Sequence, residues 1–168
     1  MTELSELEYS LIHNYKDGMI AFLKAHPECW DEAIELAVTN KQPYSWRAAW
    51  LLWSCLTKND TRIHPHIDDL IQAMEGKKDG HQREILKILL VMELNEEQES
   101  KLLDFCIQEW KQTQKTPSIR YTAFRFMYQM AKKYPELSQE IKLYTQKHYL
   151  ESLTPGVRKS IYKMIETL

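Results

Sequence analysis

Two histidines and two aspartates near the middle of the chain are the residues whose types most suggest chemistry. His64 and His66 flank Pro65, and Asp68 and Asp69 follow closely, a set that could bind a divalent metal. Ligands on a helix must share a face, whereas residues two apart diverge by about 200° at 3.6 residues per turn. Both aspartates also suit the first turn of a helix, where negative charge is favourable. We therefore predict no metal site.

The remaining histidines and the cysteines form no arrangement typical of an enzyme. The motifs GxSxG, GxGxxG and HExxH and the Walker loop are missing from the sequence. Cys29, Cys55 and Cys106 are far apart, odd in number and without a CxxC pair, as is typical of buried thiols in a reducing compartment. We predict no catalytic residue and no cofactor. With no signal-peptide pattern and no apolar run of membrane-spanning length, we also expect a cytoplasmic protein that does not contact a membrane.

Three tryptophans lie on one face of a predicted helix. Trp46, Trp50 and Trp53 stand at i, i+4 and i+7, and an aromatic stripe at this spacing usually packs into a core. Leu52 and Cys55 occupy the other side, so the helix is apolar nearly all round. Such a helix is either buried on all sides or exposes an apolar patch.

Composition indicates the elements that carry these residues. The chain has 168 residues, of which only four are glycine and six are proline, and this scarcity of turn residues favours helices. Residues 1–84 hold 9 Lys and Arg against 14 Asp and Glu, and residues 85–168 hold 13 against 10. A nucleic-acid binder usually has a stronger basic excess, so the balance disfavours nucleic acid as the partner.

The helices themselves are predicted from breakers and periodicity. Proline and glycine residues divide the chain into helix-length pieces, within which apolar residues recur three and four apart. The segment from Asn95 to Gln98, Asn-Glu-Glu-Gln, is typical of a capping box at a helix start.

Four segments of the chain share an arginine in the first turn of a predicted helix, at spacings of 36, 37 and 38 residues. Proline or glycine precedes each arginine by three or four positions, and an apolar residue follows it by three. Similarity at a fixed period of this length is typical of stacked helical pairs. The four residues are Arg47, Arg83, Arg120 and Arg158.

This pattern resembles the start of the second helix in a HEAT repeat, from about residue 30 to the end. The resemblance implies an all-α superhelix, a HEAT- or ARM-like α-solenoid of about four helix pairs plus an N-terminal helix. Residues 1–168 would form a single HEAT-like repeat domain. The N-terminal capping helix would cover about 3–24, with a bend at Gly18, and the repeats would cover about 28–60, 61–94, 95–134 and 135–168.

The resemblance also suggests roles for individual residues. We expect the four arginines to form a structural ladder, each reaching a carbonyl or carboxylate of a neighbouring turn; the alternative is a row of ligand-binding arginines. The second helices of HEAT-like solenoids line the concave surface, and their register defines an inner strip that could bind a partner, since Tyr and Arg are enriched at binding hot spots. The inner strip comprises Leu52, Ile88, Tyr121, Arg125, Tyr128, Lys159 and Lys163.

These observations predict a non-catalytic protein–protein interaction or scaffold module that binds a partner along its concave helix surface. The alternative is a nucleic-acid binding protein resembling HEAT-like DNA-alkylation-repair proteins. Its contacts would be Arg120, Arg125, Lys132, Lys133, Arg158, Lys159 and Lys163. The sequence leaves open who the partner is and whether the apolar helix completes a homodimer.

Overall fold

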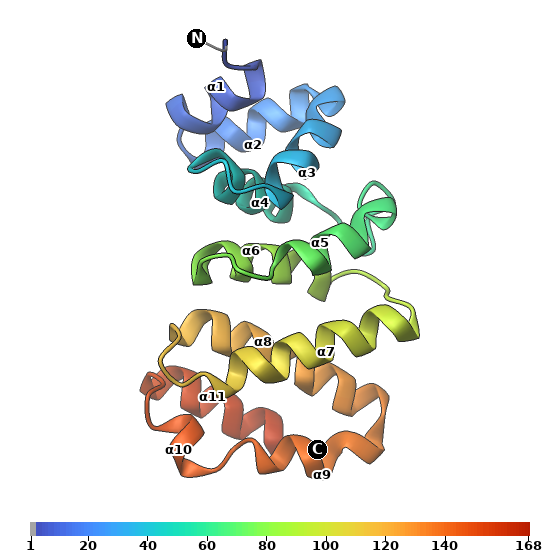
Figure 1. The fold of residues 1–168 in the computed structure, drawn as a ribbon, viewed down its shortest axis with the longest axis vertical. Helices are drawn as coiled ribbons and strands as arrows, with labels where there is room; N and C mark the ends of the chain where they lie inside the picture. The colour runs from blue at the N-terminus through green and yellow to red at the C-terminus, as the bar shows by residue number, and fades with distance from the viewer. Residues whose placement is uncertain (1–2) are drawn as a thin grey trace. The chain divides into compact units, whose positions relative to one another are not determined.

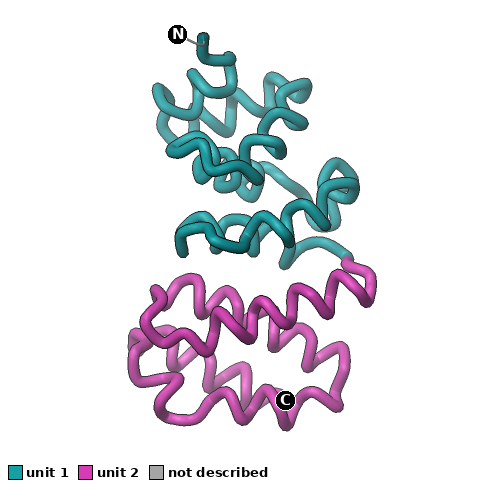
Figure 2. Tube along the Cα trace, viewed as in Figure 1, with its two compact units in different colours: residues 1–93 teal, residues 94–168 magenta. Residues whose placement is uncertain are grey.

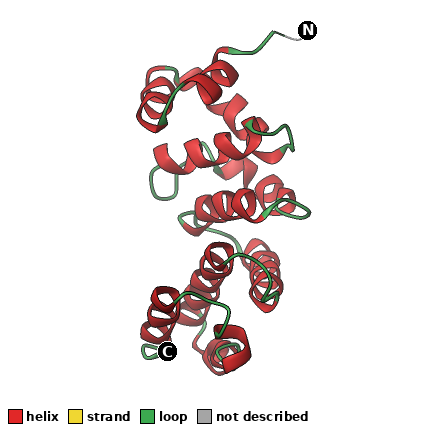
Figure 3. Ribbon diagram, turned by 90° about the vertical axis from the view of Figure 1, so that its left-hand side faces the viewer, coloured by secondary structure: helices red, strands yellow, loops and turns green. Residues whose placement is uncertain are grey.

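The computed structural model describes residues 3–168 and is all-helical over that range, with no strand (Figure 1). The chain divides into two compact units, unit 1 (residues 1–93) and unit 2 (residues 94–168) (Figure 2). Turns and loops join the helices (Figure 3), the one between residues 55 and 67 including a 3₁₀ turn at His64–His66. Among the described residues no helix is both long enough and apolar enough to cross a membrane.

Unit 1 is organised around one central helix. The helix α4 (Tyr44–Cys55) packs against four others of the unit: α1, α2, α3 and α6. The short helix α5 in turn packs on α6. The bounds of these helices are α1 Glu6–His13, α2 Lys16–Ala25, α3 Trp30–Val38, α5 Ile67–Ala73 and α6 Asp79–Leu90.

The N-terminal segment forms two helices rather than one bent helix. The break lies at Asn14 and Tyr15, whose backbones are extended, so the expected bend at Gly18 is wrong. Asn14 ends α1 because its short amide can bond locally, and its Nδ2 donates to the Oγ of Ser10 (2.8 Å). Gly18 allows α2 to start close to Asn14. A Cβ at position 18 would lie 3.1 Å from the Cβ of Asn14, which is a tight contact.

Unit 2 is built on the pairing of its two longest helices. The helix α7 (Glu96–Lys111) packs against α8 (Pro117–Lys133), and α8 also contacts α9 (Ser138–Leu143) and α11 (Pro155–Ile165). The short helix α10 (Lys147–Leu150) precedes α11. The predicted capping box at Asn95 is confirmed, with side-chain to backbone bonds in both directions between Asn95 and Gln98 (2.9 and 3.1 Å).

The tryptophan face of α4 is partly exposed, contrary to the expected core position, and Leu52 on the other side is buried. Leu52 is fully buried, whereas Trp46 and Trp53 are each 38% exposed. The reason is that α4 packs against helices on several sides, and an indole tolerates partial exposure better than a leucine side chain does because it can hold a cation over its ring. Lys87 Nζ lies 4.5 Å from the centroid of the Trp53 ring. Ile88 on α6 is also fully buried, so the prediction that Leu52 and Ile88 contact a partner is wrong.

Candidate functional site

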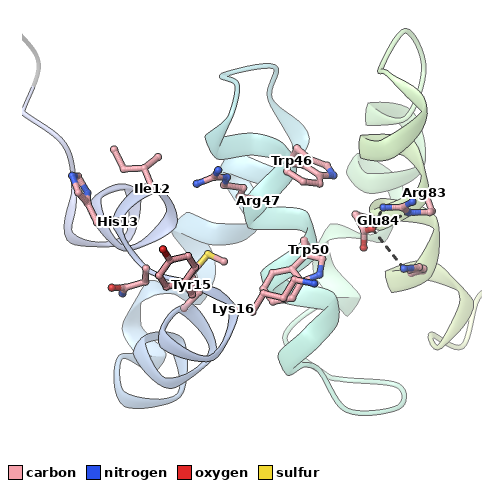
Figure 4. A pocket seen from close by; sticks show the side chains of 12 residues that line it. Ile12, His13, Tyr15, Lys16, Trp46, Arg47, Trp50, Arg83 and Glu84 are labelled. Atoms are coloured by element: carbon pink, nitrogen blue, oxygen red, sulfur yellow. Dashed lines mark hydrogen bonds and ion pairs between the residues drawn. The ribbon is translucent and has the colours of Figure 1, made fainter.

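An open cleft of about 690 Å³ lies in unit 1, where the turn between α1 and α2 faces α4 and α6 (Figure 4). Every residue that lines it belongs to unit 1. We call it the unit 1 cleft.

Aromatic side chains form one part of its lining. Trp46 and Trp50 project from α4, one turn apart, and Tyr15 stands at the break between α1 and α2 (Figure 4). Tyr15 is 92% exposed, the most exposed large apolar or aromatic side chain among the described residues. The phenol of Tyr15 and the exposed part of the Trp46 indole, 38% of that side chain, therefore offer apolar contact area to a ligand.

Four cations from three helices make up the second part of the lining. Lys16 comes from α2, Arg47 from α4, and Arg83 and Lys87 from α6. One Nη of Arg47 donates to the carbonyl of Leu11 (2.7 Å), which fixes the guanidinium and ties α4 to α1. Because a guanidinium has five N–H donors, other N–H groups of Arg47 can donate to a ligand.

A buried carboxylate holds two of these cations in place. Glu84 is only 1% exposed, and its Oε1 accepts from Arg83 Nε (3.0 Å) and Nη2 (2.8 Å). Lys87 Nζ lies 3.6 Å from the same oxygen. The second oxygen, Oε2, is buried without a hydrogen-bond donor among the described residues. In Figure 4, Arg83 and Glu84 project from α6 toward α4.

The charge of the cleft is opposite to that of its unit. Residues 1–93 hold 10 Lys and Arg against 15 Asp and Glu, a net charge of −5. The cleft lining has four of those cations and one carboxylate, a net charge of +3. A concave site of one sign focuses the electrostatic field toward ligands of the opposite sign, so this geometry favours a ligand with negative charge.

Among the described residues, the lining includes one histidine and no serine, threonine or cysteine. Its histidine, His13, stacks on Tyr9 with ring centroids 3.8 Å apart, and its Nδ1 lies 2.9 Å from the Tyr9 carbonyl oxygen.

The other two first-turn arginines lie in unit 2 and differ from each other. Arg120 is fully buried and donates to the carbonyls of Trp110 (3.0 Å) and Tyr149 (2.6 Å) and to Ser152 Oγ (2.9 Å). Burial lowers the pKa of its guanidinium. Arg158 lines a shallow depression on α11. Arg83 bonds a carboxylate of its own helix, as described above, so the four arginines do not share one type of contact.

The unit 2 part of the inner strip lies on α8 and α11. Tyr121 and Tyr128 are half-buried and Arg125 is exposed on α8, and Lys159 and Lys163 are exposed on α11. The hydroxyls of Tyr128 and Thr167 are 2.7 Å apart.

The residues first considered as metal ligands are spread over a short helix start. His64 and His66 lie in a one-turn 3₁₀ segment, His64 exposed and His66 half-buried. Within residues 3–168 no group of three or more His, Cys, Asp or Glu side chains has an arrangement that could hold a metal ion.

Sequence reasoning missed the unit 1 cleft although part of its signal was visible. Trp46 and Trp50 share a helix face, and Arg47 and Arg83 recur at equivalent positions of successive second helices. Aromatic and cationic residues repeated at one register position are the signal that could have located it. Lys16 lies too far away in the sequence to be assigned to the site without the structure.

Helix pairs that recur along the chain, with an arginine in the first turn of each second helix, define an α-solenoid. The HEAT repeat domain family matches residues 5–168 of the sequence. Because this match spans nearly the whole chain, the protein belongs to the HEAT repeat family. No curated protein and no solved structure matched the chain.

Proposed function

We propose that the chain is a non-catalytic protein-interaction module and that the unit 1 cleft binds a segment of the partner protein. Helical repeat domains commonly mediate protein interactions. The observation that carries the proposal is the convergence of Tyr15, Trp46, Trp50, Arg47 and Arg83 on one open cleft. Trp, Tyr and Arg are the residue types most enriched at binding hot spots.

The unit 2 part of the inner strip is proposed as a second contact surface. Tyr121, Arg125 and Tyr128 follow one another along α8 at helical spacing, and Arg125 is exposed.

The nucleic-acid alternative loses part of its contact set. Arg120 is fully buried, and Lys133 forms an ion pair with Glu99 (2.5 Å). Lys132 Nζ donates to the carbonyl of Thr167 (3.0 Å). Protein is therefore the partner class that the structure favours, and nucleic acid is an outcome of the test below.

We also propose a cytoplasmic location. Cys29, Cys55 and Cys106 are all free thiols, and burial raises the pKa of each. Thiols that are free and protonated suit a reducing compartment.

A site-specific crosslink tests the proposed function. A photo-crosslinking benzoylphenylalanine replaces Tyr15 at the cleft, and in a control chain it replaces Leu143, a 62% exposed residue of α9. Both chains are irradiated in a lysate of the source organism, with and without nuclease, and crosslinked species are identified by mass spectrometry. We expect a protein adduct at position 15 that survives nuclease and is missing at position 143. Equal adducts at both positions, or adducts that disappear with nuclease, would overturn the proposal.

A further inference from the structure

We propose that the segment bound in the unit 1 cleft is acidic, a stretch of peptide that carries several Asp or Glu side chains. This inference rests on the proposed function and names the chemistry of the partner.

The first support is that two cations of the cleft have no anionic partner. Neither Lys16 nor Arg47 pairs with a carboxylate within residues 3–168: Lys16 Nζ lies 5.8 Å from the centroid of the Trp50 ring, and Arg47 bonds a main-chain carbonyl. Arg83 and Lys87 both contact one oxygen of the Glu84 carboxylate. Carboxylates of a ligand would complete these pairs, and Arg in particular binds carboxylates with two parallel bonds.

The second support is the position of the cations relative to the aromatic side chains. In Figure 4, Lys16 and Arg47 lie on one side of the cleft and Arg83 on the other, and the indoles of Trp46 and Trp50 lie between them. A peptide that crosses the cleft would therefore place its apolar atoms on the indoles and its carboxylates beside cations at either side. An isolated anion would use only one of these features.

The third support distinguishes a peptide from a nucleic acid. A polyanion that extended beyond the cleft would meet a unit whose net charge is −5, whereas a short acidic segment stays within the positive lining.

Fluorescence anisotropy with three probes tests the inference. The probes are a short fluorescent peptide rich in glutamate, its counterpart with every glutamate replaced by glutamine, and a fluorescent oligothymidylate. We expect the full chain to bind the glutamate peptide, with affinity that falls as salt rises, and to bind the other two probes at least about tenfold more weakly. Equal affinity for the glutamine peptide, or tighter binding of the oligothymidylate, would overturn the inference.

Matched variants place the binding in the cleft. Lys16→Glu reverses a cleft charge, and Lys24→Glu makes the same change at an exposed position of the same helix that does not line the cleft. We expect Lys16→Glu to weaken glutamate-peptide binding roughly tenfold and Lys24→Glu to change it at most about twofold. Equal losses in the two variants would contradict a cleft site.

Glu84→Gln should change the affinity for the glutamate peptide in the opposite direction. It removes the carboxylate that competes with the ligand for Arg83 and Lys87, so we expect tighter binding of the glutamate peptide, by about threefold or more. Circular dichroism confirms that each variant is folded before its binding is compared, and weaker binding by a folded Glu84→Gln chain would contradict the inference.

The crosslink and the peptide distinguish failure of this inference from failure of the proposed function. If the Tyr15 crosslink forms but the glutamate peptide does not compete with it, the acidic class of partner segment is wrong while the proposed function stands. If the peptide binds through Lys16 but no protein crosslinks at Tyr15, the proposed function is wrong.

Discussion

His81 on α6 donates its Nε2 hydrogen to the carbonyl of Ala37 at the end of α3, 2.7 Å away. Its Nδ1 accepts from the side-chain amide of Gln42 (3.0 Å), whose Oε1 accepts from the backbone of Trp46. The Nδ1 contact requires the neutral imidazole, since a protonated Nδ1 would meet an amide N–H. Burial is the main cause that lowers the pKa of His81 to about 4, and nearby Lys77 contributes.

This contact makes stability depend on pH in a defined window. Because the pKa of His81 falls from 6.5 to about 4 on folding, the unfolded chain binds more protons between these values. The stability that the neutral His81 side chain contributes is therefore present above pH 6.5, and it declines as the pH falls from 6.5 to about 4. We expect a loss of roughly 2 kcal/mol between pH 7 and pH 4.5, measured by urea unfolding. Below pH 4.5 the pairs of Glu8 with Lys41 and of Asp60 with Arg62 add their own loss, since they lower the pKa of both carboxyls.

A variant pair assigns this pH dependence to one residue. His81→Gln should be less stable at pH 7 and should lose most of the slope between pH 6.5 and pH 4.5, whereas His64→Gln, at an exposed position, should retain it. An unchanged slope in a folded His81→Gln chain would refute this assignment.

Replacement of Arg120 should destabilise unit 2. Arg120→Met keeps the apolar stem but leaves the carbonyls of Trp110 and Tyr149 without their donor. Buried acceptors left unpaired cost about 1–3 kcal/mol each, so we expect a loss of roughly 2–4 kcal/mol in the free energy of unfolding. Arg125→Met, on the same helix but exposed, is the control and should stay within about 0.5 kcal/mol. Similar stabilities of the two variants would show that the buried bonds contribute little.

The capping box of α7 should also make a measurable contribution to the free energy of unfolding. Asn95→Ala removes the acceptor of the Gln98 N–H, and loss of an N-cap costs about 1 kcal/mol. Gln108→Ala, at an exposed position inside α7, serves as the control because alanine favours a helix interior. An Asn95→Ala chain as stable as the control in thermal unfolding would contradict a role for the cap.

The inner strip of unit 2 has its own test. Tyr121→Ala combined with Arg125→Ala should leave the fold intact, because Arg125 is exposed and Tyr121 is half-buried, and should weaken capture of the partner. Circular dichroism and a pull-down of the tagged chain measure the two effects. If the double variant unfolds, these residues belong to the core, and if capture is unchanged, the strip is not a contact surface.

The fold could be predicted from local signals. Breakers such as Pro117, the capping box at Asn95 and the arginine repeat each act within a few residues of the chain, so they indicate helix starts and helix pairing without tertiary information. The resemblance that they carry agrees with the HEAT repeat family found over residues 5–168.

The faces of α4 and the cleft could not be predicted in this way. Leu52 and Trp53 are adjacent in a helix that is apolar nearly all round, so the sequence contains no polar stripe to show which face is buried. Four neighbouring helices decide that face, and they come from distant parts of unit 1. Lys16 and Lys87 likewise meet at one cleft only because α2, α4 and α6 converge there. These are tertiary relationships that no local spacing encodes.

The most direct test of the central claim is the affinity of the full chain for the protein identified by the Tyr15 crosslink. Isothermal titration calorimetry compares the unaltered chain with Lys16→Glu and with Lys24→Glu. The unit 1 cleft as the binding site predicts a loss of roughly tenfold for Lys16→Glu and almost none for Lys24→Glu. Equal affinity of all three chains for that protein would contradict it.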